Sequence, residues 1–225
     1  MGKLWGAFVG VALIVACFAY WKVQEERDKR KEAELQLGLE ASKIINVGFQ
    51  QTSDLTVYRM AATVVTKVDC QGTIFHPEQT TKAPATVAYS IPLATIKASE
   101  YGWNPSRKRL TISIPDVRVE KPNVDISKQV VRQKGSFISR ECGLVMARKA
   151  SVALSARAFA EANKAANLTN AREAARDAVA KLATNLLRGA DMSGVRVTVL
   201  LPGETQRSSD GEHWDETRPL TEVLG

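Results

Sequence analysis

The chain has 225 residues, 44% of them hydrophobic, and a formal net charge of +7 at pH 7. This length suits one domain with a substantial core plus an anchor and a linker, and it excludes two large domains. The basic excess indicates a solvated basic surface, with attraction to anionic surfaces such as lipid headgroups as the alternative.

Cysteine and histidine are too sparse for several kinds of chemistry. Cys17 lies inside an apolar run, and Cys70 and Cys142 are far apart, so the spacing predicts neither a disulfide framework nor a zinc site. A single bridge between Cys70 and Cys142 stays open. Two histidines, His76 and His213, leave little material for histidine-based catalysis.

The first predicted element is a membrane anchor over residues 1–21. The run from Leu4 to Trp21 carries no charge, and as a helix it would span about 27 Å, close to the thickness of a bilayer core. Aromatic rings stand near both ends, where they prefer the headgroup region. The residues assigned to the span are Leu4, Trp5, Phe8, Val9, Val11, Leu13, Ile14, Val15, Phe18, Tyr20 and Trp21.

Two processing events compete with a retained anchor. Ala16 before Cys17 is typical of a lipoprotein cleavage box, but the apolar run continues past Cys17, where a lipoprotein usually turns polar. Signal cleavage after Ala19 is disfavoured by the length of the run. We therefore expect a single-pass membrane protein, with lipidation of Cys17 left open. Gly6 and Gly10 would share one helix face and allow a second helix to approach closely.

Residues 22–51 predict a charged helical stalk or linker. Glu25 and Lys29 are placed for pairing one turn apart. Positive charges following the span favour a cytoplasmic domain, yet a translocated domain stays open. Gly38 and Gly48 bracket a short amphipathic stretch that either caps the domain or lies along the membrane.

Residues 52–202 predict one α+β domain with a mainly antiparallel sheet. Apolar alternation indicates strands over 55–68, 87–93, 110–114 and 117–119. Pro92 should place the second strand near an edge or bulge. Residues 101–105 are typical of a loop. The short connections between strands favour antiparallel pairing.

The region from about 136 to 188 is rich in alanine and contains no proline, which favours long helices. Asn170 and Glu173 predict a capping box at the start of a second helix, and Gly189 supplies its end. A last strand over 195–201 and a polar, flexible tail over 203–225 follow. The apolar face of the second helix, expected to cover the sheet, consists of Ala171, Ala175, Val179, Leu182 and Leu186.

Several short motifs follow one another in a recognisable order. They are Thr86-Val87-Ala88-Tyr89, the strand from Leu110 to Pro115, Val124-Asp125 ahead of the alanine-rich helices, and Val195-Arg196-Val197. Together with the anchor, this order resembles a bacterial family of single-span proteins, domain-of-unknown-function family 4230. The resemblance covers roughly residues 55–201 and brings no catalytic residues.

The sequence contains no glycine-rich phosphate loop, nucleophile elbow, metalloprotease helix or calcium loop. Asp116, Glu120 and Asp125 follow the third strand and suit acid chemistry, although solvated loop carboxylates explain them equally. The carboxylates and histidine of residues 212–216 suit a metal, but they lie in the tail without a scaffold. We expect no catalytic residue, no metal, no cofactor and no nucleic-acid partner.

Basic side chains outnumber acidic ones across the helical region. Their long stems would solubilise an alanine-rich helix, and the alternative is contact with anionic lipid headgroups. Ala147, Ala150, Leu154, Ala158 and Glu161 form a small-residue face for helix pairing within the domain or between copies. The candidates for anionic-surface contact are Arg140, Arg148, Lys149, Arg157 and Lys164.

Three functions are consistent with these patterns. The leading hypothesis is a non-enzymatic interaction or scaffolding protein in the membrane, self-associating or bound to another membrane protein. The second is a membrane-tethered hydrolase acting on envelope material, whose small-molecule substrate the sequence does not define. The third is a module that binds anionic lipid surfaces.

Overall fold

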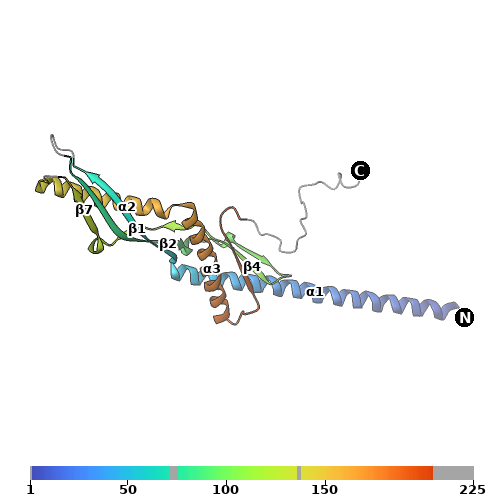
Figure 1. Cartoon of the computed structure of the whole chain (residues 1–225). Coiled ribbons are helices and arrows are strands. Elements are labelled where there is room, and N and C mark those ends of the chain that lie inside the picture. The colour runs from blue at the N-terminus through green and yellow to red at the C-terminus, as the bar shows by residue number, and fades with distance from the viewer. Residues whose placement is uncertain (1, 71–75, 136–137, 205–225) are drawn as a thin grey trace, which may run out of the picture.

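The computed structural model describes residues 2–70, 76–135 and 138–204, without the side chains of residues 2–17 and Ala19. The molecule is elongated: helix α1 extends from one end, and a long β1–β2 hairpin reaches the other end beside α2 (Figure 1). Helix α3 crosses between the two ends. The helices are α1 (Gly2–Thr52), α2 (Arg140–Ala162) and α3 (Ala165–Gly189), with 3-10 turns at Leu93–Thr95, Ala98–Glu100 and Ile126–Lys128.

Two sheets make up the β structure. In the first, β2 is central: β1 pairs along one side, and β5, β6 and β7 pair in turn along the other, all antiparallel. In the second, β4 pairs antiparallel with β3 and parallel with β8. The α+β class is therefore confirmed. The strands are β1 (Asp54–Asp69), β2 (Glu78–Pro92), β3 (Tyr101–Asn104), β4 (Arg109–Ser113), β5 (Arg118–Val119), β6 (Asn123–Val124), β7 (Val130–Lys134) and β8 (Arg196–Leu200).

The end of α1 is part of the domain. Ala41, Ile45 and Phe49 recur at the spacing of one helix face and are completely buried. They pack against the second sheet and the C-terminal half of α3, in a cluster that we call the proximal core. Its other fully buried members include Ile91, Leu93, Ile112, Val179 and Ala183. The amphipathic stretch bracketed by Gly38 and Gly48 therefore caps the domain.

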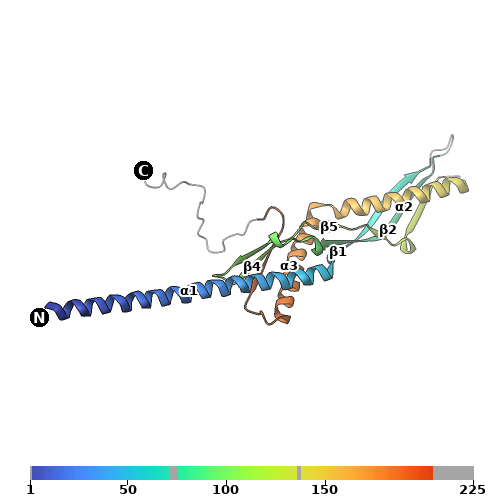
Figure 2. The ribbon, with the colours of Figure 1, turned by 180° about the vertical axis from the view of Figure 1, so that it is seen from behind.

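A second cluster, the distal core, lies between α2 and the inner face of the β1–β2 hairpin. Leu154 and Ala158 of α2 meet Val64 and Val87 of the two strands. Tyr89 is completely buried there, and its hydroxyl donates a hydrogen bond to the carbonyl of Ala162, 2.7 Å away. That carbonyl ends α2 and would otherwise lack a partner. The view from behind shows α2 lying along the hairpin (Figure 2).

The predicted membrane span falls on the N-terminal part of α1. The structure describes its backbone as helical, but most of its side chains, including those of Leu4 through Val15, lie outside the described residues. Within the described part of the chain, no helix has an apolar stretch long enough to cross a membrane. Gly6, Gly10, Cys17 and the tail beyond residue 204 also lie outside the described side chains.

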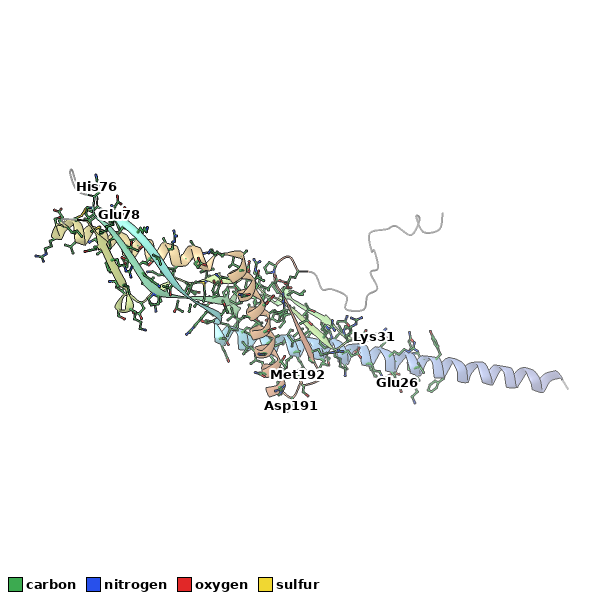
Figure 3. All side chains as sticks on the ribbon, in the orientation of Figure 1. Glu26, Lys31, His76, Glu78, Asp191 and Met192 are labelled. Atoms are coloured by element: carbon green, nitrogen blue, oxygen red, sulfur yellow. A yellow bond between two sulfur atoms is a disulfide. The ribbon has the colours of Figure 1, made fainter. Side chains whose placement is uncertain are left out.

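The stalk is helical and largely exposed, as its charged sequence predicts. Lys29 donates to Glu25 at 2.7 Å, one turn away, so the expected pair is present. Mostly exposed residues continue to Gln36, and the first side chain packed on the proximal core is that of Leu37. Glu26 and Lys31 project from this part of α1 in Figure 3. One unbroken helix therefore passes from the stalk into the domain.

Two local expectations are wrong and one is half right. Pro92 is the last residue of a central strand, so β2 is not an edge. The bulge given as the alternative is present nearby, because the register of β1 shifts between Thr56 and Tyr58, opposite Ser90 and Tyr89. Residues 101–104 form strand β3 instead of a loop, because Tyr101 and Trp103 share the face turned to the proximal core. Asn170 and Glu173 lie inside α3 and form no cap.

The break between the helices lies at Asn163 and Lys164 instead. Asn163 donates through its side chain to the carbonyl of Phe159, and Asn167 donates to that of Glu161. Both bonds satisfy carbonyls in the last turn of α2. The predicted face of α3 is correct for Ala171, Ala175 and Val179. Ala183 and Leu187 replace Leu182 and Leu186 as its fully buried members.

Replacing Gly38 by alanine is expected to lower the free energy of unfolding by about 1–3 kcal/mol. A Cβ atom at this position would lie 2.4 Å from Cγ of Trp103. The rigid indole cannot yield without shifting α1 or β3. Urea unfolding of the full chain in detergent, followed by circular dichroism, measures the loss.

Gly143→Ala in α2 is the matched control, because no heavy atom lies within 4 Å of its added Cβ. It should leave stability unchanged or raise it by up to about 1 kcal/mol. Equal losses in the two variants would contradict the close packing of Trp103 on α1.

Candidate interaction surfaces

The five predicted basic residues do not form one surface. Arg148 and Arg157 are nine residues apart, which places them on opposite sides of α2. Lys164 pairs with Glu161 at 2.7 Å, and Lys149 donates to the carbonyl of Asp69 at 3.2 Å. Arg140, Arg148 and Arg157 are exposed, and none has an ion pair among the described residues.

The position of α2 also argues against lipid contact. Its first turns lie at the end of the molecule opposite to the N-terminal end of α1 (Figure 1). If α1 inserts in a bilayer, the first turns of α2 lie at the end of the molecule remote from that bilayer. Attraction to headgroups fades within a Debye length, about 8 Å at physiological salt, which disfavours lipid contact by these turns.

The three candidate acids each have a structural partner. Asp116 forms a two-bond pair with Arg172 of α3, and this guanidinium holds the pKa of Asp116 below its usual value. Glu120 accepts a hydrogen bond from the Ser90 hydroxyl. Asp125 caps a 3-10 turn by accepting from Ser127, and this bond, with the charge of Lys128, lowers its pKa.

These acids are also dispersed. Arg118, which lies between Asp116 and Glu120, pairs with Ser90 of β2. The Asp125 amide donates to the carbonyl of Pro84, which lies six residues from Ser90 along the same strand. At the rise of a β-strand this separates the two ends by about 20 Å. The residues therefore fasten the β5–β6 segment to β2 and α3, and they do not converge on a substrate.

A shallow depression lies where β4 and β8 end together. It is lined by residues 95–97, Glu100, 113–115 and 200–204. At the β8 end, Glu204 accepts hydrogen bonds from Arg176 and from the Leu201 amide.

Within the described residues, no three histidine, cysteine or acidic side chains are grouped to hold a metal. His76 lies beside Glu78 at the far end of the hairpin (Figure 3).

An apolar stripe on the outer face of α2 was not anticipated. Val145, Val152 and Phe159 recur every seven residues, so they share one side of the helix. Their exposed fractions are 39%, 72% and 45%. We call these three residues the outer stripe. Of the predicted pairing face, Ala150, Leu154 and Ala158 are buried within the domain, the last two in the distal core, whereas Ala147 is exposed. The heptad spacing is visible in the sequence and could have indicated the stripe.

The disulfide that the sequence left undecided is present: Cys70 and Cys142 are bonded, with their Cα atoms 5.8 Å apart. Cys70 follows β1, and Cys142 lies in the first turn of α2, where its amide donates to the Ser139 hydroxyl. The bond ties the far end of the hairpin to the start of α2. Both partners therefore belong to the distal half of the molecule.

The fold defines an α+β protein in which one long helix packs into the proximal core and a hairpin with α2 forms the distal core. The chain belongs to the DUF4230 family, described as proteins of unknown function, whose model matches residues 48–197. The family membership inferred from the sequence is thus confirmed, and the single membrane span stays a prediction. No curated protein and no solved structure matches the chain.

Proposed function

We propose that this protein is a single-pass anchored interaction protein of the bacterial inner membrane, which holds its distal half at a fixed distance from the bilayer. The observation that carries the proposal is the continuity of α1, whose uncharged first part leads without a break into side chains buried in the proximal core. Such a helix transmits position and orientation, because the domain cannot turn independently of it.

The distance follows from helix geometry. Between Trp21 and Leu37 the helix rises by about 24 Å. The exposed charged side chains of this segment suit water. The distal core and the outer stripe lie still farther from the N-terminal end (Figure 1). This arrangement suits contact with a partner in the space beside the membrane better than contact with the lipid.

The disulfide favours the oxidising side of the membrane. Bonds between cysteines persist in compartments such as the bacterial periplasm and are rare in the reducing cytosol. The positive charges after the span favour the opposite orientation, but they are interspersed with acids in the stalk. We give more weight to the covalent bond and place the domain on the extracytoplasmic side.

Self-association through the outer stripe is the second part of the proposal. Valine and phenylalanine exposed at heptad spacing suit packing against an identical helix, because the same face can meet itself about a twofold axis. Association through Gly6 and Gly10 in the membrane stays a prediction from sequence.

Two measurements test the proposal. The full chain should remain with membranes after alkaline extraction, and a variant lacking residues 1–21 should be released. In detergent, the mass of the wild type by light scattering should exceed one copy, and Val152→Asp should reduce it. Val47→Asp is the control, because Val47 is 56% exposed on α1, away from the stripe. A released full chain or a strict monomer would contradict the respective part.

A further inference from the structure

Strand β1 has a long unpaired edge. In the described parts of the chain it pairs only with β2, over nearly its whole length. The segment 61–66 carries no charge, glycine or proline. Natural edge strands are usually protected by such residues, by bulges or by a covering element, because their free N–H and C=O groups recruit other strands. The one bulge in β1 lies far from this segment, at Thr56.

A groove runs along this edge, between β1 and α2. Three alanines of α2 form its wall, so space remains beside the strand for the side chains of another strand. The groove is lined by Val65, Thr66, Lys67, Ala153, Ala156, Arg157 and Ala160.

A buried hydroxyl in this groove lacks a partner. Thr66 is only 7% exposed, and its Oγ1 makes no hydrogen bond. Leaving a buried hydroxyl unpaired costs about 1–3 kcal/mol, so such groups in native proteins call for a partner. The neighbouring edge also has free backbone groups, with which an incoming strand can pair.

The charge of the groove selects the occupant. Lys67 and Arg157 line it, neither has an ion pair among the described residues, and none of the lining residues is acidic. The segment 61–66 of a second copy of β1 carries no charge, so it would offer these two cations no carboxylate. A foreign strand with an acidic side chain would neutralise them.

Resting on the proposed function of an interaction protein, we propose that the groove between the β1 edge and α2 binds an extended, acidic segment of a partner protein as an added β-strand. Main-chain hydrogen bonds to β1 supply affinity, and alternate side chains of the segment enter the groove beside the alanines. Lys67 and Arg157 form ion pairs with the carboxylates of the segment.

The probe is a short, capped peptide of alternating valine and glutamate, with a lysine-for-glutamate peptide and an N-methylated peptide as controls. Binding to the full chain in detergent is measured by fluorescence anisotropy. We expect the glutamate peptide to bind, and both controls to bind about tenfold or more weakly. Ala156→Trp, which fills the groove, should abolish binding, whereas Val47→Trp on the exposed side of α1 should retain it.

A charge reversal keeps the test independent of folding. Lys67→Glu combined with Arg157→Glu should lose the glutamate peptide and gain the lysine peptide. The proposal would be overturned if the glutamate peptide bound equally well to the Ala156→Trp variant or to the charge-reversed variant. It would also be overturned if no peptide bound the wild type. Photocrosslinking from position 65 to a second copy would overturn it too. Membrane retention and oligomer mass, measured on the same samples, show whether the proposed function fails separately.

Discussion

Replacing Phe49 by alanine is expected to lower the free energy of unfolding by about 3–5 kcal/mol. Phe49 is completely buried where α1 enters the proximal core, among side chains of the second sheet and α3. The cavity left by the missing ring cannot collapse easily, because α3, β4 and the turn at Leu93–Thr95 pack against α1. Urea unfolding of the full chain in detergent, followed by circular dichroism, gives the magnitude.

Val47→Ala is the matched control, because Val47 lies on the exposed side of the same helix turn. Its effect should stay within about 0.5 kcal/mol. A second readout is limited proteolysis: a loosened α1 end should become cleavable near residue 49 before the rest of the domain unfolds. If Phe49→Ala and Val47→Ala behaved alike, α1 would be a tether and not a rigid strut.

A helix packed rigidly into the domain would fix the orientation in which the domain meets a partner. A flexible linker lets a domain sample many orientations, whereas a helix packed into the core fixes one. The outer stripe and the β1 groove both lie in the distal half (Figure 1). Both surfaces therefore lie toward the same end of the elongated molecule. If the two proposed surfaces bind partners, the packing of α1 into the proximal core fixes the orientation in which those partners are met.

Periodic patterns located several of the regular elements, but they missed the first half of β2 and the whole of β7. Strong alternation located β1, β4 and β8 to within one or two residues, and the alanine-rich composition located both long helices. The same patterns failed where tertiary contacts decide. β3 depends on Trp103 packing over Gly38, and the break between α2 and α3 depends on side-chain bonds from Asn163 and Asn167. Neither contact is visible as a period in the sequence.

The candidate surfaces were harder to predict than the fold. Charge counting identified the basic residues of α2 but not that Arg148 and Arg157 face opposite ways. The groove combines residues of β1 with residues of α2 that are almost ninety positions away. Only the topology brings them together, because β1 is an edge and α2 lies across it. The strength of a local pattern therefore says little about such a site.

Removing the disulfide by the double change Cys70→Ala and Cys142→Ala is expected to cost about 2–4 kcal/mol. The bond spans 72 residues, and a loop of that length restricts the unfolded chain strongly. The loss should be largest in the distal half. Hydrogen exchange should therefore increase in α2 and at the far end of the hairpin, while α1 and α3 near the proximal core keep their protection.

The same bond makes the sidedness measurable. A thiol-alkylating reagent added to intact cells after reduction should label Cys70 and Cys142 if the domain faces outward, and neither cysteine should react before reduction. A reductant should destabilise the wild type by about the same amount as the double variant loses, and it should leave that variant unchanged. Free thiols in untreated cells would place the domain in the cytosol. The strut would then direct its groove and stripe toward cytosolic partners, because its geometry does not depend on the side that it faces.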